Sequence, residues 1–329
     1  MKSTSSLIKR IATTVCACAF LAVGAIAMSG CSVLGVVDNE EPPTVGDCVF
    51  NDGDTITNGV LTVGVNGSNT PYAGTNSDGE LVGYDVDIAA VLADECGCKV
   101  EIVDVGGDGT SAVLEGRVDV ALGLTKPAED IEGITYTSAY VNDGASLYCL
   151  SSNKPASISE VDFANSVFVV QNGTAVYNTL ATTVPAENIA LTDTMQEAFD
   201  TLSSGQATYL ACDALVGDYY AKNTEGVERI SYLSATDVVP IYMATSSAKS
   251  TLSTTIISTL GQITTSGELE IVTAKWLGSD GANLMPGKVD LDALPTTFPP
   301  TAEQPATDAA ATDAAATEET ATEGEQAAQ

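Results

Sequence analysis

Hydrophobic and polar residues follow two different periods along the first half of the chain. Ile88, Val91 and Leu92 recur at helical spacing, and Asp85 or Asp87 can cap the start of that helix. SAVLEGR at residues 111–117 predicts a second, shorter helix. Short runs rich in β-branched residues predict strands around these helices: GVLTVGV (59–65), CKVEIVDV (98–105) and VDVALGLT (118–125).

A second series of strands and helices follows the first. Its expected strands are SVFVVQNGT (166–174), ATYLACD (207–213) and VVPIYMATS (238–246). Its expected helices are AVYNTLATTV (175–184), TMQEAFDTLSSG (194–205) and one long segment at 250–278. Strands that alternate with helices pair in parallel and carry the helices on their faces. The pattern therefore predicts two α/β units and a closing helix that can return to either.

The N-terminus has the pattern of a secretion signal. A basic start (Lys2, Lys9, Arg10) precedes an apolar stretch and the small residues before Cys31. The small residues and cysteine resemble a bacterial lipobox, so we expect residues 1–30 to be cleaved, Cys31 to carry lipid and 31–55 to form a tether. An ordinary signal peptide with a chance cysteine and an uncleaved anchor remain alternatives.

The C-terminus has the opposite character. Residues 299–329 contain no aromatic residue and no Leu, Ile or Val. Such a segment cannot bury enough apolar surface to offset its ordering entropy, so we expect a disordered acidic tail. About 250 residues remain for folding, enough for one large domain or two smaller ones.

Charge narrows the choice of partners. The chain has 12 basic and 44 acidic residues, and three of the basic ones lie in the signal. Nucleic acid would repel such a protein, and anionic headgroups would too, so membrane attachment should be covalent.

The cysteines point to structure rather than to metal. Five follow Cys31, namely Cys48, Cys96, Cys98, Cys149 and Cys212, and the chain has no histidine. A secreted location permits disulfides, but the odd number leaves at least one thiol free or paired elsewhere. The Cys-x-Cys spacing at 96–98 is not that of a zinc site, so no metal or cofactor is expected.

Seven motifs in order resemble the bacterial extracellular solute-binding proteins of family 3, the polar amino-acid receptors of ABC importers. They are GVLTVGVNGSNTPYAG, DGELVGYDVDIAAVLADECG, VLEGRVDVALGLT, ITYTSAYV, VFVVQNGTAVY, LSSGQATYLACD and SGELEIVTAKWLG. The resemblance implies a monomeric, two-lobed periplasmic-binding-protein-like α/β fold. Lobe one would comprise 56–147 and 240–290, and lobe two 148–239. Two strand crossovers, near 147–150 and 238–243, would form the hinge, with the ligand in the cleft between the lobes.

The second series of elements offers ligand contacts at its strand ends, where ligands bind in open parallel sheets. Gly173 and Thr174 precede a helix, whose free N–H groups can take a carboxylate. Asp213 ends a strand at the position where the family holds the ligand's ammonium group. The alternative for Asp213 is a helix N-cap, and both roles are compatible.

The first series departs from the family at the strand end that contains Gly123 and Thr125. There the family continues into a Thr-x-x-Arg segment whose arginine grips the ligand carboxylate, and this chain has no such arginine. Lys126 is the one cation in place, and it can act as a point charge without the planar fork. Alternatively it is a solvated lysine among Glu129 and Asp130, and an acidic cleft would then favour a cationic ligand.

Aromatic residues are scarce where the family packs rings on the ligand. Tyr72 lies near one such position, or is a plain core residue, and Asn69 replaces another frequent aromatic. Asp85 and Asp87 look like a catalytic pair, but adjacent acids that open a helix are usually caps and dipole partners.

The resemblance implies a cell-surface receptor that delivers a small polar solute, an amino acid or related amine, to an ABC permease. We expect no enzyme, because the chain lacks histidine and so has no Ser-His or Cys-His arrangement. A sensor or adhesin that kept the fold but lost transport is the main alternative. A dehydratase-like enzyme would need cations for a dicarboxylate, and the chain has few.

Overall fold

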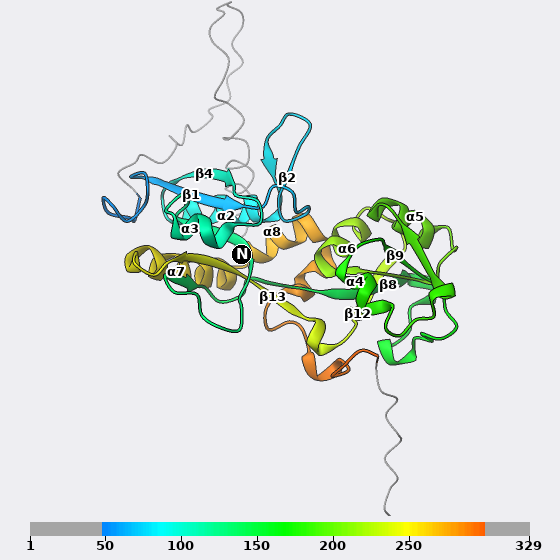
Figure 1. Cartoon of the computed structure of the whole chain (residues 1–329). Coiled ribbons are helices and arrows are strands. Elements are labelled where there is room, and N and C mark those ends of the chain that lie inside the picture. Colours follow the sequence, from blue (N-terminus) through cyan, green and yellow to red (C-terminus); the bar gives the residue numbers. More distant parts are fainter. Residues whose placement is uncertain (1–47, 300–329) are drawn as a thin grey trace, which may run out of the picture.

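The computed structural model describes residues 48–299, which form two α/β units side by side (Figure 1). The signal, Cys31 and nearly all of the acidic tail lie outside these residues. Strands of the first unit are β1 (Val60–Val65), β2 (Gly74–Thr75), β3 (Leu81–Val82), β4 (Lys99–Asp104), β5 (Val120–Thr125), β6 (Ile134–Tyr136), β7 (Val141–Asp143) and β13 (Val239–Ser246). Its helices are α2 (Tyr84–Glu95), α3 (Gly109–Leu114), α7 (Ser250–Ser266) and α8 (Glu268–Leu277).

The second unit contains the middle of the chain. Its strands are β8 (Ala145–Leu150), β9 (Phe168–Gln171), β10 (Ile189–Thr192), β11 (Tyr209–Asp213) and β12 (Val227–Tyr232). Its helices are α4 (Ala175–Leu180), α5 (Met195–Ser203) and α6 (Ala214–Ala221), and short 3-10 turns are η2 (Ser151–Asn153), η3 (Ile158–Glu160) and η4 (Ala186–Asn188). A 3-10 segment, η6 (Ser279–Leu284), follows α8.

Each unit is built on one mixed sheet. The first sheet has the order β4-β1-β5-β13-β6, with β7 also paired to β13. β1 runs parallel to β4 and β5, whereas β13 is antiparallel to its neighbours. The second sheet has the order β10-β9-β11-β8-β12, with β8 antiparallel to β11 and β12. The predicted parallel pairing therefore holds on one side of each sheet, over β4, β1 and β5 and over β10, β9 and β11, and the strands next to the crossings are antiparallel.

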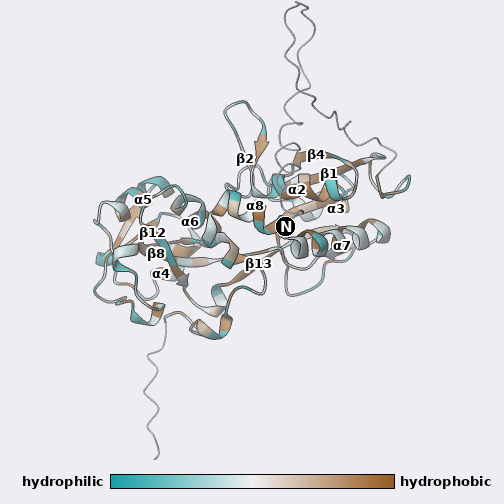
Figure 2. Ribbon diagram, turned by 180° about the vertical axis from the view of Figure 1, so that it is seen from behind, coloured by the Kyte–Doolittle hydropathy of each residue, from teal (hydrophilic) through white to brown (hydrophobic). Residues whose placement is uncertain are grey.

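Alternating side chains explain why both faces of each sheet are covered. On β1, Leu61, Val63 and Val65 belong to the core beneath α2, α7 and α8. On β9, Phe168 and Val170 enter one core, and Val169 enters another on the opposite face. Figure 2 colours the central strands largely as hydrophobic and the connecting turns as hydrophilic.

The chain crosses between the two sheets twice. The first crossing is at Gly144, between β7 and β8, and the second occupies residues 233–238, between β12 and β13. The first crossing lies just before the expected range of residues 147–150, because β8 already belongs to the second sheet. The crossings touch: a Cβ on Gly144, whose φ is 123°, would lie 1.8 Å from the carbonyl oxygen of Asp237. Only glycine fits this approach.

Two details of the helices differ from expectation. The segment predicted as one helix at 250–278 is broken at Gly267, which has a left-handed φ of 88° and separates α7 from α8. The prediction that Asp85 or Asp87 caps α2 is wrong. Gly83, which has no side chain, occupies the N-cap position, and both aspartates lie inside the first turn, where they bond to distant elements.

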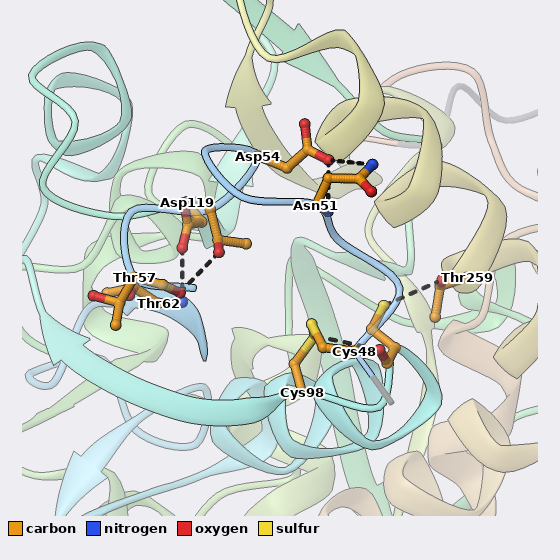
Figure 3. The surroundings of a disulfide bond; sticks show 10 residues. Cys48, Asn51, Asp54, Thr57, Thr62, Cys98, Asp119 and Thr259 are labelled. Atoms are coloured by element: carbon orange, nitrogen blue, oxygen red, sulfur yellow. Dashed lines mark hydrogen bonds between the residues drawn. A yellow bond between two sulfur atoms is a disulfide. The ribbon is translucent and has the colours of Figure 1, made fainter. Parts of the chain in front are cut away.

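The N-terminal part of the described chain is fastened to the first unit (Figure 3). A disulfide joins Cys48 to Cys98. Buried Asp119 accepts hydrogen bonds from the backbone N–H groups of Ile56 (2.9 Å) and Thr62 (3.0 Å). Residues 48–55, assigned to the tether from the sequence, therefore belong to the folded unit.

The segment after η6 runs from the first unit to the second. Val289 and Leu294 pack against the core of the first unit. Ala235 donates its backbone N–H to the carbonyl oxygen of Pro295 (2.8 Å), and the ring of Phe298 lies 5.1 Å from that of Phe163 in the second unit. Within residues 48–299, no helix is long and apolar enough to cross a membrane.

Candidate functional site

Tyr72 is joined to the first crossing by a partly buried hydrogen bond. It lies in the loop between β1 and β2, and its hydroxyl donates to Oδ2 of Asp143 at 2.7 Å. The other oxygen of Asp143 accepts the backbone N–H groups of Gly144 (2.8 Å) and Leu215 (3.0 Å). Asp143 therefore ties together a loop of the first unit, the crossing and the first turn of α6. Tyr72 itself is 5% exposed.

Gly123 is held by a second buried pair. The hydroxyl of Tyr140 donates to Oδ1 of Asp85 at 2.6 Å and accepts the backbone N–H of Gly123 at 2.9 Å. Gly123 has a φ of 74°, and a Cβ there would lie 2.8 Å from Oδ2 of Asp85. The sequence needs glycine here because the carboxyl group of Asp85 lies against the strand.

Burial controls the protonation of these groups. It raises the pKa of Asp85 to about 7, although the hydrogen bond from Tyr140 acts in the opposite direction. Burial also raises the pKa of Asp143, whereas the hydrogen bonds from the N–H of Leu215 and the hydroxyl of Tyr72 lower it. The pKa of the Tyr72 hydroxyl is raised well above its ordinary value, first by burial and then by the charge of Asp143.

Asp213 is the carboxylate at the end of β11. It occupies the N-cap position of α6, but its side chain makes no cap bond. Among the described residues its carboxylate has no hydrogen-bond or ion-pair partner, whereas the negative charge of Asp143 lies close enough to affect it. Burial, followed by the charge of Asp143, raises the pKa of Asp213 to about 6. The site thus contains one half-buried carboxylate that the described protein does not neutralise.

Gly173 and Thr174 lie where β9 runs into α4. The Thr174 hydroxyl caps the helix by accepting from the N–H of Tyr177 (3.2 Å), and it donates to the carbonyl oxygen of Gln171 (2.9 Å). Gly173 is exposed and has a φ of 77°. The expected strand-to-helix turn is therefore present, at the start of a six-residue helix.

Three predicted residues lie apart from the buried bonds. Lys126 pairs with Asp130 at 3.1 Å, with 41% of the lysine side chain exposed, and its Nζ lies 5.9 Å from the ring centre of Tyr136. Thr125 and Asn69 are exposed, and the backbone of Asn69 pairs with Ala73. Lys126 thus contacts its own loop, which agrees with the alternative interpretation that it is a solvated lysine among acidic residues.

Sequence reasoning missed Asp143 and Tyr140, and it gave Asp85 the wrong role. The only local signal is the run Tyr140–Asp143 directly before a glycine, where polar side chains interrupt a strand. Asp87, the other expected cap, accepts from the indole N–H of Trp276 (2.6 Å) and from Lys275. Neither aspartate therefore resembles half of a catalytic pair. In residues 48–299, no group of three or more Cys, Asp or Glu side chains is arranged to hold a metal ion.

Comparison with known proteins places this architecture in a family. The model of the bacterial extracellular solute-binding proteins, family 3, matches residues 61–279. Since that is most of the chain, the protein belongs to this family of extracytoplasmic solute-binding proteins, and its two units are the lobes of their periplasmic-binding-protein-like fold.

Individual relatives agree with the family assignment. A probable amino-acid ABC transporter-binding protein of Haemophilus influenzae is 26% identical over 67% of this chain and 85% of its own. The L-cystine-binding protein TcyA of Bacillus subtilis is 25% identical over 68% of this chain and 82% of its own. Among solved structures, an ancestral cationic amino acid solute-binding protein has a TM-score of 0.57 and 26% identity, over 67% of this chain and 96% of its own. All three are named as binding proteins, and the first is named as a binding protein of an ABC transporter.

Proposed function

We propose that the protein is the solute receptor of an ABC importer, and that it holds the ammonium group of a small polar solute against Asp213. Relatives named for binding amino acids and L-cystine support an amino acid or related amine as the solute. The resemblance to a cationic amino acid-binding protein supports a ligand rich in positive charge.

The observation that supports this proposal most strongly is that the Asp213 carboxylate lacks a partner among the described residues. Burial of a charged group costs free energy, and a hydrogen-bond donor or a cation beside the group offsets that cost. Asp213 has neither among the described residues, and burial together with the neighbouring Asp143 raises its pKa to about 6. A ligand ammonium group would supply the missing positive charge, and closure of the lobes would desolvate the contact.

The described protein offers few groups that could bind a carboxylate at the other end of the ligand. Arg117 pairs with Glu115 (2.8 Å) and Arg229 with Asp218 (3.1 Å), so neither replaces the absent arginine of the family. A ligand carboxylate would have to draw Lys126 away from Asp130 or use the backbone at Gly173 and Thr174. Amines without a carboxylate avoid this requirement.

A ligand panel tests the proposal. Thermal unfolding should be measured with the common amino acids, L-cystine, and amines such as putrescine. We expect at least one of them to raise the melting temperature and to reduce the radius of gyration in solution scattering, because the crossings at Gly144 and 233–238 act as a hinge. Stabilisation without compaction would contradict closure.

The absent arginine also favours a second candidate, a surface sensor or adhesin that has lost transport. No response to any compound of the panel would support that candidate and contradict the receptor.

The location proposal has its own test. We propose that lipid on Cys31 anchors the protein, as a monomer, to the outer face of the cell membrane. Cys31→Ala should release the protein into the medium or leave an unprocessed precursor. A variant that stays attached and processed like the parent would show that the anchor is not on this cysteine.

A further inference from the structure

A cavity of about 530 Å³ lies away from the candidate site, between β12 and the chain that follows α8. Arg229 and Tyr232 of β12 form one wall. Asp280 and Asn283 of η6 and Lys288 of the C-terminal segment form another. None of the residues predicted to contact the solute lines this cavity. Its volume falls within the range of about 300–1,000 Å³ usual for small-molecule pockets.

The guanidinium of Arg229 is mostly buried but only partly used. The side chain is 10% exposed, and its Nε donates to Oδ1 of Asp218 at 3.1 Å. Its Nη2 lies 3.5 Å from the carbonyl oxygen of Asp280, longer than an ordinary hydrogen bond. A guanidinium has five N–H donors in a planar fork that matches a carboxylate. Arg229 lines the cavity, and several of its N–H donors are therefore unused within the described residues.

Three basic and three acidic residues line this cavity, and the acidic ones are Glu228, Asp280 and Asp290. Residues 48–299 contain nine lysines and arginines, and three of them line it: Lys154, Arg229 and Lys288. Lys154 is neutralised by Glu228 at 2.9 Å. Lys288 has no ion pair within the described residues. The cavity lining is therefore balanced in formal charge, unlike the acidic chain as a whole, and an anion bound there would have to lie on the side of Arg229 and Lys288.

We propose that this cavity is a second ligand site that takes a small organic carboxylate. Its carboxylate group would accept hydrogen bonds from the unused N–H donors of Arg229 and from Lys288, while Tyr232 and Asn283 line the remaining space. The site uses none of the residues that are proposed to bind the solute. It draws one wall from the second sheet and another from the segment that follows the first, so a bound carboxylate bridges parts of both units.

Calorimetry with acetate, succinate and citrate tests the site at constant ionic strength set with sodium chloride. We expect saturable binding of at least one of these acids. Lys288→Met should weaken it roughly tenfold or more, the usual effect of removing a charged hydrogen-bond donor. Arg229→Lys, which keeps the charge and loses the fork, should weaken it by a similar factor. The matched control is Lys99→Met, because Lys99 is an exposed lysine on β4 without an ion pair in the described chain, and it should bind like the parent.

Three results would overturn the proposal. The first is the absence of binding by all three acids, which would mean that the cavity holds only water. The second is an equal loss in Lys99→Met, which would reduce the effect to overall charge. The third is equally tight binding of sulfate, which would reveal a general anion site rather than a carboxylate site. Arg229→Lys is interpreted only if its unfolding midpoint matches the parent, and Lys288→Met, at an exposed residue, decides the question without it.

Discussion

The two sheets differ in how they treat the carboxyl groups near their strand ends. Around the first sheet, Asp85 is bonded by Tyr140, and Asp143 by Tyr72 and two backbone N–H groups. At the end of β11 in the second sheet, Asp213 has no such partner among the described residues. Asp213 is half-buried, and burial of a charged group costs free energy unless a partner offsets it. The comparison suggests that the bonded carboxyl groups hold the lobes and strand ends in place, and that Asp213 is kept for the ligand.

The largest expected effect comes from removing the unpartnered carboxylate. Asp213→Asn should weaken ligand binding by about 2–5 kcal/mol, the usual cost of removing one partner of a buried charged contact. That corresponds to a loss of roughly thirty- to several-thousand-fold in affinity. Calorimetry with the ligand found in the panel measures it. Asp200→Asn on α5 removes the same charge from an exposed site of the same lobe and should bind normally.

The pH dependence of binding sharpens this prediction. Because the pKa of Asp213 is about 6, the carboxylate is charged above that pH and protonated below it. Affinity for an ammonium group should therefore be full near pH 8 and fall as the pH drops through 6. The Asp213→Asn variant should lack this step, and a step of equal size in the variant would assign the titration to another group.

The second prediction concerns stability and Asp85, one of the hydrogen-bonded carboxyl groups around the first sheet. The pKa of Asp85 is raised to about 7 in the folded protein, against about 3.9 for an ordinary aspartate. The folded state therefore binds the extra proton, and its contribution to stability is present below pH 4 and is lost as pH rises to 7. At about 1.4 kcal/mol for each pKa unit, the loss is on the order of 4 kcal/mol at most.

Urea unfolding at pH 5 and pH 8 measures this loss. The parent should become less stable at pH 8, and Asp85→Asn should lose less, because an amide needs no proton to stay neutral. Asp143 and Asp218 also have raised pKa values, so part of the slope should remain. Asp94→Asn, on an exposed position of the same helix, is the control and should keep the full slope.

The sequence predicted the architecture well because that depends on local pattern. Strands such as β1 and β5, and helices such as α2 and α5, follow from periodicity alone. The helical pattern at 250–278 did not predict the break at Gly267, although Ser266–Gly267 is a turn signal inside it. A long amphipathic pattern on both sides masked that signal.

The candidate site was only partly predictable, since its bonds join residues far apart in the chain. Tyr140 is 55 positions from Asp85, and Asp143 is 71 from Tyr72. A single sequence carries no mark of such pairs, and capping is the commonest role of an acid that opens a helix. Asp213 could be singled out because its place at a strand end can be read locally. Its lack of a partner could not.

A smaller effect should follow from shortening Tyr72. Tyr72→Phe keeps the ring and removes the donor to Asp143, which retains its two backbone N–H partners. We expect a loss of about 1–2 kcal/mol in the free energy of unfolding and a nearly unchanged ligand affinity. Tyr242→Phe is a suitable control, because that hydroxyl makes no hydrogen bond within the described residues. A large loss of affinity with normal stability would instead mean that the hydroxyl of Tyr72 contacts the ligand.

The smallest effect is expected at Lys126, and it decides what the ligand's other end looks like. The pair with Asp130 is exposed, and such pairs contribute under about 1 kcal/mol, so Lys126→Met should barely change the unfolding midpoint. Ligand binding separates two cases. In the first, Lys126 stays solvated and its loss does not change the affinity. In the second, closure of the lobes draws Lys126 onto a ligand carboxylate and desolvates it, so its loss would cost about 2–5 kcal/mol. The contacts seen here favour the first case, in which Lys126→Met binds as tightly as the parent while Asp213→Asn fails. The ligand is then better sought among amines and other cations than among plain α-amino acids. If both variants lose affinity, the ligand carries a carboxylate, and Lys126 replaces the arginine that the family places at this strand end.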